Sequence, residues 1–218
     1  MEKHVLQLIW NKSMSAHLLK ISRLEGLTDG IFAIAMTIII LNLHVPLNLS
    51  DGKISLLIKS EIYTNLFIYI GTFIILGTHW IAMNFQWGLL ERLNRVYLWV
   101  SMFYLMVICV IPFSANLLGA YKYNIHSINF YIGNLLCASL GQILSLHIAE
   151  HYKLFKDVYT QAIYRAAALR ILIAPIFYIS ALILAHWSTK AAFVLLVLPT
   201  VIYMIPGRID RFEGIKIT

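Results

Sequence analysis

The sequence predicts an all-α membrane protein with six transmembrane helices per subunit. The chain has 218 residues, of which 60% are hydrophobic and 12% are charged, and its mean hydropathy is +0.78. Soluble domains are about half apolar and about a quarter charged, and a water-soluble fold of this size could not hide so much apolar surface. The apolar residues also gather in six runs, as expected for helices that cross a bilayer.

Five of the six runs reach the roughly 20 residues that a membrane-spanning helix needs. In chain order the runs cover about 24–45, 63–90, 96–119, 128–148, 166–186 and 191–205. The sixth run is short, bounded by Lys190 and by Pro206, and is still interpreted as a span. Since no linker or polar domain interrupts the series, residues 1–218 are predicted to form one transmembrane domain, with 1–19 as a cytoplasmic lead-in.

The distribution of basic residues orients the six runs. An even number of spans leaves both termini on one side of the membrane. With the termini inside, the inner side carries thirteen of the 17 Lys and Arg residues. The four on the outer side are Lys53, Lys59, Lys122 and Lys190. Because inner loops are enriched in Lys and Arg, we expect a multi-pass protein of the cell membrane with cytoplasmic N- and C-termini. The net charge of +7 could suggest a nucleic-acid partner, but this bias toward the inner side explains it, so no nucleic-acid partner is expected.

The motifs that would indicate an enzyme or a metal site are absent from the sequence. It contains no Gly-x-Ser-x-Gly, no phosphate-binding loop and no His/Cys ligand spacing. Cys109 and Cys137 lie inside apolar runs and are expected to be small buried side chains. We therefore expect neither enzymatic activity nor a cofactor.

The first run carries the most informative pattern. Arg23, Glu25 and Asp29 lie at or inside the inner edge of an otherwise apolar helix, where acidic groups are costly and usually functional or paired. At about 100° per residue, Ile34, Ile38 and Leu41 share one stripe, and Asp29 points almost the opposite way. Asp29 therefore needs partners from other helices. His79, Trp80 and Asn84 of the second run lie at a suitable depth.

These residues resemble the prokaryotic branch of the transmembrane protein 175 family of potassium channels. The family motif is Arg, three residues and Phe-Ser-Asp, followed by a Gly-Ile/Val-Phe-Ala-Ile-Ala-like helix with a Thr. Here it reads Arg23, Leu27-Thr28-Asp29, Gly30 to Ala35 and Thr37. Further similarity comes from His79-Trp80 and from the stretch from Pro112 to Gly119. The likeness covers the first 120 residues, but Met83-Asn84-Phe85 stands where the family often has His-His-Arg.

The resemblance implies a K⁺-permeable cation channel that works as a homotetramer, with four copies of helix 1 lining the pore. It implies that Ile34, Ile38 and Leu41 line the pore and that Ile34 forms the main constriction. Thr37 matches a pore-adjacent Thr to which ion selectivity has been attributed. Arg23, Asp29, His79, Trp80 and Asn84 are expected to form a structural polar network. The implied partners are K⁺ and related monovalent cations, the bilayer and further copies of the chain.

Other interpretations remain open at this point. An apolar stripe on a membrane helix usually faces lipid or packs against neighbours, and a lone Thr often bonds back to a carbonyl of its own helix. His79 can be a packed histidine, and Arg170 is expected to snorkel to the inner face or to meet a carboxylate. A secondary transporter of ions or small solutes is the main alternative, although Pro112 and Pro175 form no repeated pair of helix breaks. A structural membrane scaffold would leave the polar motif of the first run unexplained.

Overall fold

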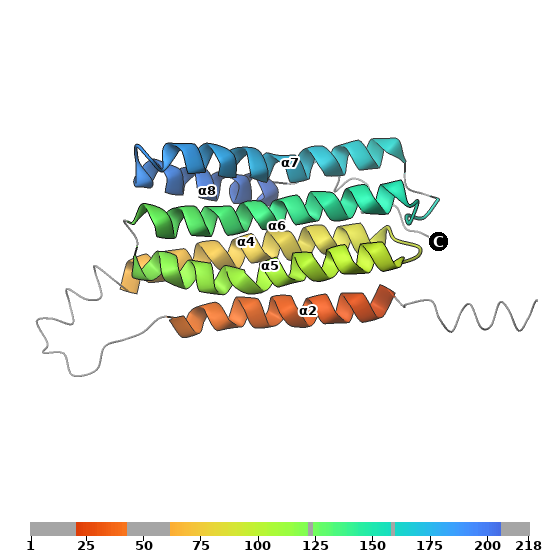
Figure 1. The fold of residues 1–218 in the computed structure, drawn as a ribbon, viewed down its shortest axis with the longest axis horizontal. Coiled ribbons are helices and arrows are strands. Elements are labelled where there is room, and N and C mark those ends of the chain that lie inside the picture. The colour runs from red at the N-terminus through yellow and green to blue at the C-terminus, as the bar shows by residue number, and fades with distance from the viewer. Residues whose placement is uncertain (1–20, 43–61, 122–123, 158–159, 206–218) are drawn as a thin grey trace, which may run out of the picture.

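The computed structural model describes residues 21–42, 62–121, 124–157 and 160–205, and within them the chain forms six α-helices and one short 3-10 helix. The helices run up and down beside one another (Figure 1). They are α2 (Ile21–Ile38) with its extension η1 (Ile39–Asn42), α4 (Tyr63–Gly88), α5 (Arg95–Ala120), α6 (Ile125–His151), α7 (Gln161–Leu184) and α8 (Thr189–Met204). The predicted all-α fold is confirmed, while the lead-in predicted for 1–19 lies outside the described residues.

Polar residues mark the starts of the last four helices. The side chains of Asn94, Asn124, Thr160 and Ser188 each accept a hydrogen bond from a backbone N–H in the first turn of α5, α6, α7 and α8. The initial N–H groups of a helix have no partner within the helix, so such caps fix where it begins. The cap at Thr160 starts α7 several residues before the apolar run that predicted it.

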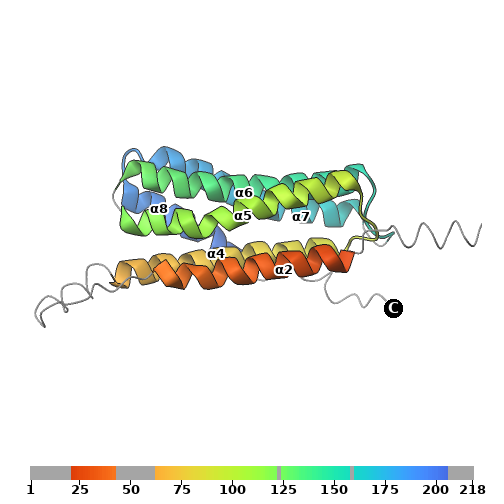
Figure 2. The same cartoon turned by 60° about the horizontal axis from the view of Figure 1, so that its bottom comes forward.

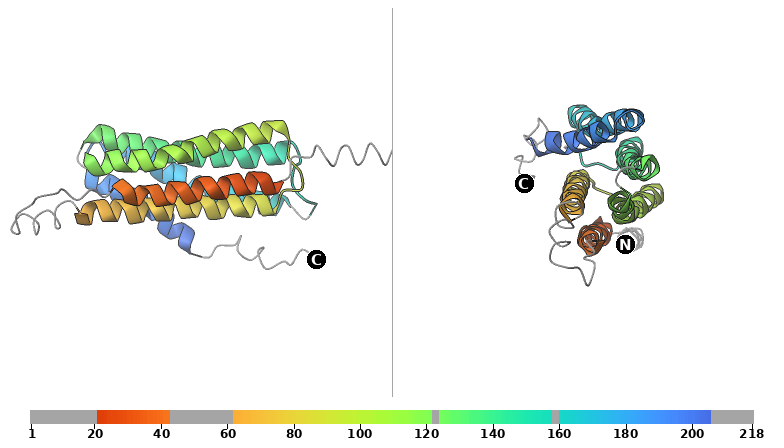
Figure 3. Two further views of the ribbon diagram at one scale, coloured as in Figure 1. Left: turned by 90° about the horizontal axis from the view of Figure 1, so that it is seen from below. Right: turned by 90° about the vertical axis from the view of Figure 1, so that its left-hand side faces the viewer.

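The order of packing places α2 at the edge of the bundle. α2 packs against α4 and α5, α6 packs between α5 and α7, and α8 packs on α7. Figures 2 and 3 show α2 and α4 side by side along their length, and the end view in Figure 3 leaves most of the circumference of α2 uncovered. One large face of α2 is therefore open in the isolated subunit.

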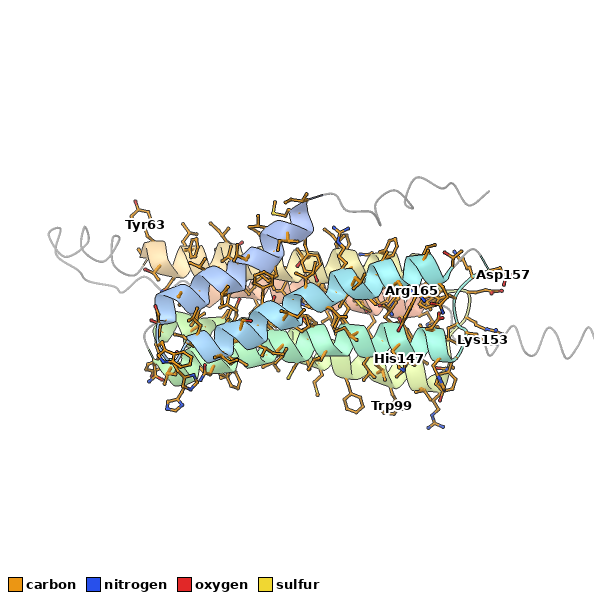
Figure 4. The ribbon with its side chains drawn as sticks, turned by 90° about the horizontal axis from the view of Figure 1, so that it is seen from above. Tyr63, Trp99, His147, Lys153, Asp157 and Arg165 are labelled. Atoms are coloured by element: carbon orange, nitrogen blue, oxygen red, sulfur yellow. The ribbon has the colours of Figure 1, made fainter. Side chains whose placement is uncertain are left out.

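Five helices are long and apolar enough to cross a bilayer, and α8 is shorter. Its 16 residues span about 24 Å, against a hydrocarbon core of about 30 Å. α8 contains Pro199 and runs obliquely across α4, as Figures 3 and 4 show. The sixth span is thus present as a helix, but it is shorter than the membrane core.

Cys109 and Cys137 differ from the expectation for them. Both are free thiols on the exposed surface of the subunit and are not buried in its core. The interior of a bilayer is as apolar as the interior of a protein, so an apolar run around a residue does not reveal whether its side chain faces lipid or protein.

Two loops are joined at one end of the bundle. The 89–92 and 153–156 segments form an isolated antiparallel bridge between Leu90 and Phe155. Arg92 Nη2 donates to the carbonyl of Lys153 at 3.2 Å, and Lys156 Nζ donates to the carbonyl of Gly88 at 2.9 Å. Figure 4 places Lys153, Asp157 and Arg165 at this end and Tyr63 at the other, so this end gathers basic residues that the charge distribution assigns to the inner side.

Replacing Lys153 by Gly is expected to stabilise the fold. Lys153 follows the end of α6 with a φ of 51°, and its neighbour Leu154 donates to the carbonyl of Ala149, as in a glycine-terminated helix. A residue with a Cβ is strained there, so Lys153→Gly should raise the free energy of unfolding by about 0.5–1 kcal/mol. Thermal unfolding in detergent measures this. Lys153→Ala is the control, because an equal gain from it would assign the effect to the lost charge.

Candidate functional site on helix α2

The buried face of α2 anchors the helix to the rest of the subunit. It consists of Leu24, Thr28, Phe32, Ala35 and Ile39, which recur every three or four residues as one helical face requires. The Phe32 ring lies 6.4 Å from the ring of Tyr104 on α5. This face fixes the rotation of α2 and therefore determines which residues point outward.

The stripe predicted on the first helix lies on the outside of the subunit. The exposed fractions of Ile34, Ile38 and Leu41 are 59%, 43% and 72%. Burying such side chains is worth about 1.5–3 kcal/mol each in water, so in this chain they must face lipid or another protein surface. Since the stripe points away from the subunit core, a single subunit does not enclose a path along it.

Asp29 has its partner on the neighbouring helix. Trp80 Nε1 on α4 donates to Asp29 Oδ1 at 2.8 Å, a short charge-assisted hydrogen bond that ties α2 to α4. Asn84 contributes indirectly, because its Nδ2 donates to the backbone carbonyl of Trp80 at 3.2 Å. The structure therefore brings together Asp29 and Trp80 as side chains, with Asn84 one turn further along α4.

His79 and Arg23 lie apart from this pair. His79 is buried, and its Nδ1 lies 3.3 Å from the hydroxyl of Tyr104 on α5. Neighbouring residues on a helix point about 100° apart, so His79 faces the bundle interior while Trp80 faces α2. Arg23 is exposed in the first turn of α2.

The hydroxyl of Thr37 bonds to its own helix. Thr37 Oγ1 donates to the carbonyl of Ala33 at 2.9 Å and to that of Ile34 at 3.0 Å, which is the common behaviour of Thr within helices. The side chain is nevertheless exposed. Because the hydroxyl proton points at these carbonyls, the lone pairs of Thr37 Oγ1 remain available to accept a hydrogen bond.

The same region matches a family model. The model described as endosomal/lysosomal potassium channel TMEM175 matches residues 23–112. These residues run from Arg23 through α2 and α4 into α5, and they include the Asp29–Trp80 pair and the exposed stripe. The family resemblance is confirmed. The TMEM175 match ends at Pro112, within the first 120 residues to which the sequence resemblance pointed.

Two bacterial relatives and one solved structure extend the TMEM175 comparison. A protein named as a potassium channel from Streptomyces collinus is 26% identical over 99 residues, covering 45% of this chain and 48% of that protein. Another, from a Chryseobacterium species, is 24% identical over 191 residues, covering 85% and 93%. The chain thus spans about half of the first relative and most of the second.

The solved structure supports the fold across both halves of the chain. It is a crystal structure of a lysosomal potassium-selective channel TMEM175 homolog from Chamaesiphon minutus, with a TM-score of 0.70 and 18% identity. The match covers 84% of this chain and 96% of that one. The arrangement of helices is therefore that of a TMEM175 homolog beyond the region that the family model matches.

A departure from the TMEM175 pattern has a structural reason. Where the family often has His-His-Arg, this chain has Met83-Asn84-Phe85. Met83 is fully buried in the core and Phe85 is packed against it. Apolar packing therefore replaces the basic cluster at this level of α4.

Two polar residues outside α2 were not singled out correctly from the sequence. Gln142 on α6, for which no sequence motif predicts a role, is buried at 4% exposure. Arg170 lies nine residues beyond the start of α7, roughly 13 Å along the helix, which is deeper than the apolar run suggested. Arg170 Nη2 donates to the carbonyl of Tyr203 at 2.9 Å. The polar spacing of Ser139, Gln142 and Ser145 on one face of α6 was the available signal.

Proposed function

We propose that the chain is the subunit of a K⁺-permeable cation channel that works as a homotetramer with four copies of α2 around the pore. The observation that carries the proposal is the exposed apolar stripe of Ile34, Ile38 and Leu41 on the helix where the TMEM175 match begins. The two bacterial relatives named as potassium channels support the choice of ion. The proposal needs no cofactor, and the permeant species is K⁺ or a related monovalent cation.

Small residues beside the stripe support assembly through α2. Gly26 and Gly30 are exposed, and a Cβ added at either would meet nothing within 4 Å. Small side chains allow membrane helices to approach closely. A neighbouring copy can therefore pack on this face while the stripe turns toward the symmetry axis, and closed cyclic symmetry then completes the pore.

The constriction is proposed at Ile34, with Ile38 and Leu41 one and two turns further out. A ring of four isoleucine side chains excludes water, and such a ring gates by dewetting. K⁺ gives up its hydration water more easily than Na⁺, so a narrow apolar ring favours K⁺ modestly without a cage of carbonyl oxygens. Thr37 is the selectivity candidate, since its oxygen can face a dehydrating cation while its proton stays on the helix.

The polar residues around α2 are proposed to hold the helix in place. Asp29 and Trp80 form the central contact, Asn84 and Arg23 extend it toward the end of the bundle, and His79 fixes α4 from the interior side. The protein is proposed to be a single domain of the cell membrane with both termini in the cytoplasm, as the basic residues gathered near Lys153 and Arg165 favour.

Ion flux from liposomes that contain the purified protein tests the channel function. We expect rapid flux ranked by permeant ion when K⁺, Rb⁺, Cs⁺ and Na⁺ are compared. Stoichiometric coupling to a second ion, with saturation at low turnover, would instead establish a secondary transporter. The prolines inside α5, α7 and α8 leave each helix continuous, which gives the transporter little structural support.

The assembly state provides an independent prediction. Mass measurement in detergent or nanodiscs is expected to find four copies of the 24.9 kDa chain. An exposed stripe on an edge helix cannot line a pore within one subunit. Finding the monomer as the sole species would therefore refute the pore proposed here.

Thr37 can be tested with a pair of variants. Thr37→Val removes the oxygen but keeps the shape, and it should lower the K⁺ over Na⁺ preference without changing the assembly. Thr37→Ser keeps the hydroxyl and is expected to retain the preference. The measurement is the flux ratio for the two ions. Equal ratios in wild type and Thr37→Val would assign selectivity to the apolar ring alone.

A further inference from the structure

A cavity lies between α4, α6, α7 and α8, away from α2. Its volume is about 100 Å³. One water molecule needs about 10–15 Å³ of such space, so the cavity has room for a small organic group. Apolar side chains form much of its wall, among them Ile81, Phe85 and Ile171. A cavity with such a wall inside a membrane-spanning bundle suits a molecule with an apolar body.

The cavity reaches the outer surface of the subunit at Ile81. This residue lines the cavity, and its exposed fraction is 59%. Ile81 precedes Gly88, the last residue of α4, by seven residues, or about 10 Å along the helix. A molecule that enters at this depth comes from the bilayer. Because charged groups are costly there, the route favours a neutral molecule.

Several polar groups of the cavity wall already have partners within the protein. The hydroxyls of Thr78 and Ser139 donate to carbonyls of their own helices at 2.7 and 3.1 Å. Arg170 Nη2 donates to the carbonyl of Tyr203 at 2.9 Å, and the Tyr203 hydroxyl donates to the carbonyl of Arg170 at 2.6 Å. These contacts engage the four side chains within the bundle, so none of them is needed to explain a ligand.

Gln142 on α6 differs from these residues. Its side chain lines the cavity and is 4% exposed. The amide interacts with the ring of His79, but its Nε2 has no hydrogen-bond partner among the residues that the structure describes. The amide oxygen therefore makes the contact with His79. Since a buried donor without an acceptor is destabilising, the group that would complete the cavity wall is a hydrogen-bond acceptor.

We propose that this cavity binds a neutral, lipid-soluble molecule through a carbonyl oxygen that accepts from Gln142 Nε2. A carbonyl oxygen accepts hydrogen bonds and donates none, so it satisfies the amide without adding a donor that needs a partner of its own. The apolar body of the ligand packs on Phe85 and Ile171, and its tail leaves along Ile81. This inference goes beyond the proposed channel function and does not rest on it.

Ligand-dependent stabilisation of the full chain tests the site. The protein is purified in an uncharged detergent, and its unfolding midpoint is measured with increasing 2-dodecanone, dodecane or acetone. A ligand that binds the folded state raises the midpoint by mass action. We expect 2-dodecanone to do so. Dodecane, which has no acceptor, and acetone, which has no apolar tail, should have little effect. Gln142→Leu should weaken the apparent affinity for 2-dodecanone about fivefold, as for the loss of one neutral hydrogen bond.

Two further pairs of residues sharpen the measurement. Gln86 is a buried glutamine of α4 outside the cavity, and its Nε2 donates to the Tyr97 hydroxyl at 3.2 Å, so Gln86→Leu should leave the affinity unchanged. Ala82 lines the cavity, whereas Ala168 is a half-buried alanine of α7 outside it. Ala82→Leu fills the cavity without removing a polar group and should abolish the response to 2-dodecanone, and Ala168→Leu should not.

The remaining outcomes each overturn a defined part of the proposal. Equal affinity in wild type and Gln142→Leu refutes the hydrogen bond to Nε2, and stabilisation by dodecane as strong as by 2-dodecanone refutes recognition of a carbonyl group. A response to acetone as strong as to 2-dodecanone refutes the membrane-borne source. No response to any probe refutes the ligand and leaves water as the occupant. If Gln142→Leu does not fold, Ala82→Leu decides: lost affinity supports the site, and unchanged affinity refutes it.

Discussion

Replacing Ile34 by Asn is expected to raise the basal K⁺ flux by about tenfold and to reduce the K⁺ over Na⁺ preference. The physical reason is the loss of a dry ring. Four isoleucine side chains on the axis keep water out, and a polar amide in each subunit lets water fill the constriction. A decrease of about 1.4 kcal/mol in the barrier to ion passage gives a tenfold increase in rate. This energy is less than the free energy gained by burying one isoleucine side chain.

Ile176 provides a matched control for this measurement. It is an isoleucine of α7 with an exposed fraction of 62%, close to the 59% of Ile34, but it lies on a helix that is not proposed to line the pore. Ile176→Asn should therefore leave the flux at its wild-type value. Unchanged flux in Ile34→Asn, together with a large change from a residue on another helix, would mean that the pore is lined elsewhere and would favour the transporter.

Helical periodicity was sufficient to find the stripe on α2 and its extension η1. The spacing of Ile34, Ile38 and Leu41 places them on one face of the helix, wherever that helix packs in the bundle. All three are exposed in the structure. The depth of Trp80 in its span was sufficient to name it among the possible partners of Asp29. The first inference needs only the periodicity of one helix, and the second needs only the depth of a residue in the membrane.

The surroundings of His79 could not be obtained in the same way. His79 and Trp80 are neighbours in sequence, and the rotation of α4 against α2 and α5 sends one to Tyr104 and the other to Asp29. That rotation is set by packing across several helices. The sequence therefore grouped the two residues in one network, while the structure separates their side chains.

The depth of Arg170 was underestimated for a local reason. The first turns of α7 contain Gln161, Tyr164 and Arg165, which lower the hydropathy, so the apolar run starts later than the helix. The cap at Thr160 is the signal that marks the true start. With that start, Arg170 lies within the span, and it lines the same cavity as Gln142 of α6.

Replacing Asp29 by Asn is expected to lower the unfolding midpoint and the yield of assembled protein more than it changes the ranking of permeant ions. The Asp29–Trp80 bond is charge-assisted and short. Such bonds contribute about 1.5–3 kcal/mol, and neutral ones contribute about 0.5–1.5 kcal/mol, so the amide should cost about 1 kcal/mol. Thermal unfolding, the assembled fraction and ion flux are measured on the same preparation.

Trp80→Phe is expected to cost more than Asp29→Asn, about 2 kcal/mol, because it removes the indole donor and leaves the carboxylate of Asp29 without this bond at a membrane helix. Trp187→Phe is the control, since Trp187 is an exposed tryptophan beyond the end of α7. If the two residues act as a pair, the double variant will be less destabilised than the sum of the single ones. The opposite pattern, normal assembly of Asp29→Asn with a lost preference for cations, would make Asp29 a charge of the pore. It would also require α2 to be rotated so that Asp29, and not Ile34, faces the axis.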